Sequence, residues 1–159
     1  MKIDVFFTPA GLSPSDVAGR SVVVLDILRA TTTIAFALAG GAKAVLPAAS
    51  TEEALRIAQN LERDDMLLAG ERRSVRIPGF ALGNSPLEFT PEAVRGKTIV
   101  MTTTNGTQAL IAAQGAREII VGAAVNFALV VQRARTALEQ HGDLAILCAG
   151  RERQFALED

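Results

Sequence analysis

The sequence predicts an α/β protein with three layers, α/β/α, around a mostly parallel central sheet. Three observations support this class. Short apolar runs rich in Val and Ile alternate with stretches of helical periodicity along the 159 residues. Clusters of Gly, Pro, Ser and Thr separate the two kinds of segment. Neither a repeat nor a linker interrupts the alternation, so we expect a single α/β domain covering residues 1–159.

Seven apolar runs are predicted to form the strands. The run from Ser21 to Asp26 is the strongest, because its valines and leucine are apolar on both faces, as in a central parallel strand. The predicted strands cover residues 3–7, 21–26, 44–47, 66–70, 98–101, 118–122 and 144–148.

Helical periodicity fills most of the intervals between the strands. Ser50 or Thr51 is the expected cap of one of these helices. Residues 72–90 show neither period, and a loop of this length in a compact domain is usually functional or mobile. The predicted helices cover residues 34–39, 51–63, 91–94, 108–114 and 126–140.

Composition narrows the classes of function. Sixteen basic and seventeen acidic residues leave a net charge of -1, and Trp and Tyr are absent, so we expect neither a nucleic-acid nor a membrane partner. A single Cys excludes an internal disulfide. Neither a signal peptide nor a membrane-spanning run is visible, which predicts a cytoplasmic protein. A homo-oligomer stays open.

The ends of the predicted strands carry the candidate chemistry. In open parallel sheets, ligands bind beyond the carboxyl ends of the strands. Asp26 and Glu71 each end a strand, Arg29 follows the first, and the chain beyond the last strand reaches Glu158 and Asp159. Carboxylates, hydroxyls and water suit Mg²⁺, while arginine suits phosphate. The strand ends therefore predict metal-assisted chemistry on a phosphate ester.

The junction from Thr102 to Thr107 is the second candidate feature. It connects a predicted strand to a predicted helix through Thr102, Thr103, Thr104, Asn105, Gly106 and Thr107. Free N–H groups at a helix start attract anions, the hydroxyls add donors, and glycine lets a ligand approach the backbone. A single Thr or Asn acting as a helix cap explains one polar residue but not five, so we expect a phosphate cradle.

Simpler explanations exist for several of these residues. Asp26 is equally well explained as a cap of the following helix, and Glu71 taken alone as a solvated ion pair with its neighbouring arginines. Cys148 lies in an apolar run and is expected to be a buried small side chain. His141 is expected at a helix end. With one His and one Cys, a catalytic triad and a zinc site are not expected.

Five blocks of sequence, in order, resemble the 2-phosphosulfolactate phosphatase family. They lie between Val22 and the last residue, and their agreement as a set is more specific than any one of them. The blocks are Val22–Thr33, Gly70-Glu71-Arg72, Pro78–Phe80 with Leu82–Pro86 and Glu88, Thr102–Thr107, and Leu147–Gly150 with Phe155–Asp159.

The resemblance implies an activity and a set of site residues. The family is described as Mg²⁺-dependent phosphatases that convert 2-phosphosulfolactate to sulfolactate in coenzyme M biosynthesis, on an α/β fold. By this resemblance, the candidates for metal binding or acid–base catalysis are Asp26, Glu71, Glu158 and Asp159. Substrate contacts fall to Arg29, Asn84, Ser85 and the Thr102–Thr107 junction.

Three features depart from the family pattern. Arg73–Ile77 replaces a glycine-containing loop, and Ala81 stands where family members usually have Asp. Family members also continue beyond Leu157-Glu158-Asp159, so we expect that the chain lacks its last elements on the C-terminal side and exposes apolar surface there.

The leading hypothesis is a Mg²⁺-dependent phosphatase acting on a small phosphorylated hydroxy acid. Water on the metal would attack phosphorus, Asp26 and Glu71 would hold the metal, and Arg29 with the Thr102–Thr107 amides would stabilise charge on the phosphoryl oxygens. A route through a phosphorylated Asp26 stays open. The rival hypothesis is a non-catalytic binding module for a phosphorylated metabolite.

Overall fold

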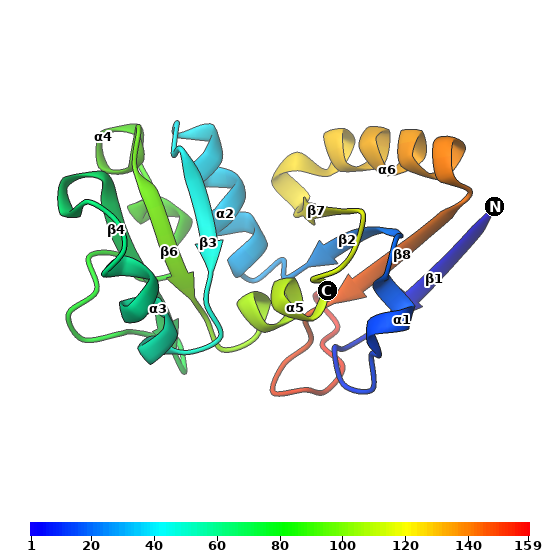
Figure 1. Ribbon diagram of the computed structural model, residues 1–159, viewed down its shortest axis with the longest axis horizontal. Helices are drawn as coiled ribbons and strands as arrows, with labels where there is room; N and C mark the ends of the chain where they lie inside the picture. The colour runs from blue at the N-terminus through cyan, green and yellow to red at the C-terminus, as the bar shows by residue number, and fades with distance from the viewer.

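The computed structural model describes residues 1–159 and places the strands in two sheets (Figure 1). Both sheets are parallel, apart from one short antiparallel hairpin. The first contains, in spatial order, β1 (Lys2–Phe6), β8 (Asp143–Cys148), β2 (Ser21–Leu25) and β7 (Glu118–Gly122). The second contains β3 (Ala44–Pro47), β6 (Thr98–Thr102), β4 (Met66–Arg72) and β5 (Val75–Arg76).

Helices occupy most of the intervals between strands. They are α1 (Pro14–Val17), α2 (Ala30–Ala39), α3 (Thr51–Ala58), α4 (Pro91–Val94), α5 (Gly106–Ala112) and α6 (Phe127–His141). Three short 3-10 helices, η1 (Arg63–Asp65), η2 (Pro86–Glu88) and η3 (Ala124–Asn126), complete the set. None of the helices has the length and apolar character needed to cross a bilayer.

The two sheets share an inner layer of helices. On β6, Ile99 and Met101 belong to the main core together with Ile34 of α2 and Leu110 of α5, whereas Val100 faces the second core beneath α3. On the first sheet, β2 likewise turns alternate valines to the main core, and α6 contacts β2, β7 and β8. Each sheet thus has helices on both faces, which confirms the α/β/α class.

The division into two sheets differs from the single central sheet expected from the sequence. Edge strands β3 and β7 lie on either side of an apolar cavity of about 370 Å³ and do not pair. Ile34 of α2 and Leu110 of α5 also line this cavity. The chain passes between the sheets only twice, once through α2 and once through α5.

Most predicted elements are confirmed, with changes at their ends. Helix α2 begins at Ala30, earlier than expected, and α3 ends at Ala58, before the expected Arg63. Ser50 caps α3, since its hydroxyl accepts the N–H of Glu53 at 3.1 Å. The prediction of no strand within residues 72–90 is wrong, because β5 pairs with β4 there. Two residues are too few to show an alternating pattern.

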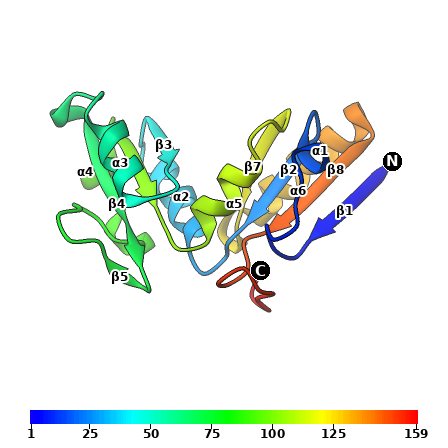
Figure 2. The same ribbon diagram turned by 60° about the horizontal axis from the view of Figure 1, so that its bottom comes forward.

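Exposed apolar side chains lie along edge strand β1. Ile3, Val5 and Phe7 are all exposed, and the ring of Phe7 packs edge-on against Phe155 of the C-terminal segment. That segment returns to the middle of the molecule, near the carboxyl end of β2 (Figure 2).

Candidate active site

A polar cavity of about 370 Å³ lies at the carboxyl ends of strands from both sheets. Its wall includes residues that follow β2, β4, β6 and β8, as expected for a parallel sheet. Eight predicted site residues line it: Asp26, Arg29, Glu71, Asn84, Thr104, Asn105, Glu158 and Asp159. The wall also includes Leu28, Arg73, Ser74, Gly150, Arg151 and Glu152.

Asp26 is a buried carboxylate between the starts of α2 and α5. Its Oδ1 accepts the N–H of Ala30 at 3.1 Å, and its main-chain oxygen accepts the N–H of Thr31. A Cβ added to Gly106 would collide with its Oδ2, so the glycine lets α5 approach the carboxylate. Burial, opposed by the N–H of Ala30 and reinforced by Asp159, raises the pKa of Asp26 to about 6. Asp26 therefore accepts the first N–H of α2, although Arg29 is the N-cap residue, and lines the cavity at the same time.

Glu71 joins the β4–β5 hairpin to the junction after β6. One carboxylate oxygen accepts the N–H of Thr104 at 2.7 Å, and the other accepts the N–H of Ser74 at 2.7 Å and the hydroxyl of Thr104 at 3.1 Å. The interpretation of Glu71 as a solvated ion pair is wrong, since it is buried and its neighbour Arg72 donates to Thr102 Oγ1 instead.

Asp159 holds two main-chain segments at the cavity. Its Oδ1 accepts the N–H of Ile27 and its Oδ2 the N–H of Gly150, both at 3.0 Å. Burial raises the pKa of Asp159, and the neighbouring charge of Glu158 acts in the same direction. Asp159 therefore connects the segment after β2 to the segment after β8.

Most hydrogen-bond donors of the threonine junction are bonded to other groups of the protein. Thr103 and Thr107 bond reciprocally, each main-chain N–H to the other's hydroxyl, at 2.9 and 3.0 Å. The N–H of Thr104 goes to Glu71. The hydroxyl of Thr102 accepts from Arg72, and the side chain of Asn105 accepts the N–H of Glu152 at 3.0 Å. This network leaves the N–H groups of Asn105 and Gly106 outside it.

Several predicted contacts are consequently absent from the cavity wall. Of the junction, Thr104 and Asn105 line the cavity, whereas Thr102, Thr103, Gly106 and Thr107 are buried behind it. Ser85 does not line it, whereas its neighbour Asn84 does. The buried threonines therefore act through the residues that they hold. Cys148 is buried and unpaired, and His141 ends α6, as expected.

Oxygen atoms dominate the donor set available to a cation. No three His, Cys, Asp or Glu side chains lie close enough together to hold a metal ion by themselves. The buried Oδ1 of Asn84 has no hydrogen-bond partner, however, and Asp26 and Glu158 line the same cavity. A buried oxygen without a hydrogen-bond donor is unfavourable unless a water, a ligand or a cation binds to it. These residues fit a hard divalent cation that keeps several waters.

Sequence comparison identifies the family. A family model described as 2-phosphosulpholactate phosphatase matches residues 6–159. Several relatives carry the name "Probable 2-phosphosulfolactate phosphatase". The protein of Caldanaerobacter subterraneus is 45% identical over 159 residues, that of Carboxydothermus hydrogenoformans 45% over 159, and that of Symbiobacterium thermophilum 49% over 144.

These alignments cover 100%, 100% and 91% of this chain and 65%, 63% and 60% of the respective relatives. The chain thus spans somewhat less than two thirds of the length of these relatives. The cavity residues after β2, β4, β6 and β8 all lie within the matched range. The chain belongs to the 2-phosphosulfolactate phosphatase family.

Proposed function

We propose that this cavity is the active site of a Mg²⁺-dependent phosphatase that hydrolyses a small phosphorylated hydroxy acid, by family resemblance 2-phosphosulfolactate to sulfolactate and phosphate. One observation carries the proposal: the buried Oδ1 of Asn84, which has no hydrogen-bond partner, the carboxylate of Asp26 and arginines without ion pairs share a single cavity at the strand ends. The names of the relatives support the same reaction.

The charge of the cavity argues for a cation. Its wall carries five carboxyl groups against three guanidinium groups, a formal excess of negative charge. A phosphate ester entering this wall would be repelled unless that charge were offset. The raised pKa of Asp26 reflects the same imbalance, because burial and nearby carboxylates penalise its ionised form.

Mg²⁺ fits this requirement. We assign it to Asp26, Glu158 and the Oδ1 of Asn84, whose oxygens are less occupied than those of Glu71 and Asp159. Water and the substrate would complete its coordination, as is usual for this ion. When bound, the ion would offset the carboxylate charge and the charge that develops on the phosphoryl oxygens.

The remaining residues bind and position the ester. Arg29 lines the cavity directly before α2 and is suited to bind two phosphoryl oxygens through its planar guanidinium. The N–H of Asn105, which lines the cavity and has no partner in the junction network, is the junction donor left to help it. Glu71 and Asp159 hold the surrounding loops in place, so that these donors need little rearrangement when substrate binds.

Phosphate release from 2-phosphosulfolactate, with and without Mg²⁺, tests the proposal. We expect release that EDTA abolishes and millimolar Mg²⁺ restores. Better rescue by stoichiometric Zn²⁺ would contradict the oxygen-ligand assignment. Calorimetric binding of the ester without any release would instead establish the non-catalytic binding module.

A further inference from the structure

Two tight turns in the chain keep non-glycine residues in left-handed backbone. Arg73 and Ser74 have φ of 50° and 65°, and Glu152 and Arg153 have φ of 51° and 66°; no other non-glycine residue has a positive φ. Two-residue turns of this kind favour Asn and Gly, because side chains crowd the backbone there. Arg73, Ser74 and Glu152 line the cavity, so three of the four residues with this unfavourable geometry lie at its rim.

The first turn closes the β4–β5 hairpin of the second sheet. Arg72 pairs with Val75 across it, and Glu71 fixes its backbone by accepting the N–H of Ser74. The N–H of Arg73 points to the hydroxyl of Thr104 at 3.4 Å. Arg73 lines the cavity, and its guanidinium forms no ion pair within the chain, although carboxylates line the same wall.

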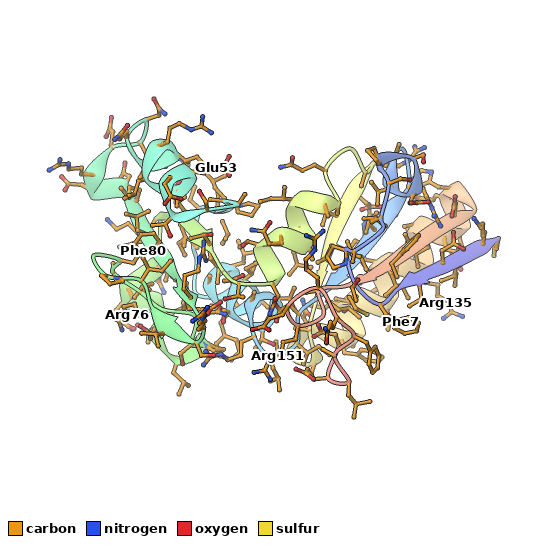
Figure 3. The ribbon with its side chains drawn as sticks, turned by 90° about the horizontal axis from the view of Figure 1, so that it is seen from below. Phe7, Glu53, Arg76, Phe80, Arg135 and Arg151 are labelled. Atoms are coloured by element: carbon orange, nitrogen blue, oxygen red, sulfur yellow. The ribbon has the colours of Figure 1, made fainter.

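The second turn follows β8 of the first sheet. Arg151 and Gln154 exchange two main-chain hydrogen bonds of 2.9 Å around it, and the N–H of Glu152 donates to Asn105. Arg151 lines the cavity and also forms no ion pair. Figure 3 shows it between the two halves of the molecule. The two turns therefore bring one arginine each, free of ion pairs, from different sheets to a common cavity.

We propose that Arg73 and Arg151 are specificity residues that bind the acidic groups of the substrate other than its phosphate, whether carboxylate or sulfonate. The inference rests on the proposed function and extends it, because that function assigns Arg29 to the phosphoryl group and leaves Arg73 and Arg151 without a role. Guanidinium groups bind carboxylate and sulfonate oxygens through paired hydrogen bonds. Anchored turns hold these two arginines at the rim with less freedom than a mobile loop would give.

Steady-state kinetics on two esters test the assignment. 2-Phosphosulfolactate carries further acidic groups, whereas glycerol 2-phosphate carries its phosphate on a secondary alcohol without any. We expect Arg73→Gln and Arg151→Gln each to raise KM for 2-phosphosulfolactate about tenfold or more. For the same substrate kcat should stay within about threefold, and KM for glycerol 2-phosphate should not change.

Arg153→Gln is the matched control. It removes the same charge from the same turn, but Arg153 does not line the cavity, so KM should stay at the wild-type value for both esters. An equal rise of KM for both esters, or none for 2-phosphosulfolactate, would overturn the assignment while leaving the phosphatase proposal standing.

Failure of the phosphatase proposal can be distinguished from failure of the arginine assignment. If the wild-type chain releases no phosphate from any ester, calorimetry can still measure how each arginine contributes to the affinity for sulfolactate. Binding that weakens about tenfold in Arg73→Gln and in Arg151→Gln, but not in Arg153→Gln, would support the assignment. Identical sulfolactate binding by all the proteins would refute it.

Discussion

Replacing Asp26 by Asn should abolish phosphate release and, at neutral pH, make the protein more stable. The pKa of Asp26 rises from 3.8 to about 6 in the folded chain, about two units at roughly 1.4 kcal/mol each. A raised pKa means that the folded state holds the proton more tightly. The contribution of Asp26 to stability is therefore complete below about pH 4 and is lost as the pH rises through about 6.

Asparagine keeps the acceptor for the N–H of Ala30 and removes the charge. At pH 7.5 we expect Asp26→Asn to raise the free energy of unfolding by about 1–3 kcal/mol, the upper figure corresponding to the full shift. For a chain of this size that corresponds to a rise in Tm of roughly 2–4 °C per kcal/mol. At pH 4 the gain should nearly vanish.

Urea unfolding in EDTA at both pH values measures this effect, with phosphate release in Mg²⁺ measured in parallel. Asp16→Asn is the control of opposite sign, because hydrogen bonds from Ser13 lower the pKa of Asp16 and its replacement should not stabilise the protein. A variant that is less stable than wild type at pH 7.5 and still releases phosphate would leave Asp26 as a helix cap alone.

Two further substitutions test how the cavity is held together. Glu71→Gln turns one acceptor oxygen into a donor that must face the N–H of Ser74 or Thr104. We expect urea unfolding to show a free energy of unfolding lower by about 2–4 kcal/mol, together with loss of phosphate release. The control Glu88→Gln, outside the cavity, should lower the free energy of unfolding by less than about 1 kcal/mol. Gly106→Ala places a methyl group against the Asp26 carboxylate, and we expect it to lower the free energy of unfolding by about 1–3 kcal/mol. Wild-type stability with unchanged phosphate release would show that the contact is not tight.

The cavity was predictable from the sequence because parallel strands carry the residues that follow them to one edge of the sheet. Asp26, Glu71 and Asp159 were found in this way, whereas Arg151 and Glu152, which lie in the same segment after β8 as Asp159, were not singled out. Their turn has no periodic pattern, so only its position after a strand marks it.

The roles within the threonine junction were not readable from the sequence. A hydroxyl is equally able to face a ligand or a neighbouring backbone, and Thr103 and Thr107 face each other. The division into two sheets was also not predictable from the sequence. Whether β3 and β7 pair depends on how α2 and α5 pack between them, which no local pattern records.

The two passages of the chain between the sheets have a mechanical consequence. Because β3 and β7 share no hydrogen bond, a change in the angle between the sheets breaks no ladder and is resisted chiefly by apolar contacts around α2 and α5. Both helices begin beside the polar cavity, so any such change alters the width of that cavity directly. A ligand that contacts both walls must restrict the relative motion of the two halves, and substrate affinity is thereby linked to the stiffness of the whole chain.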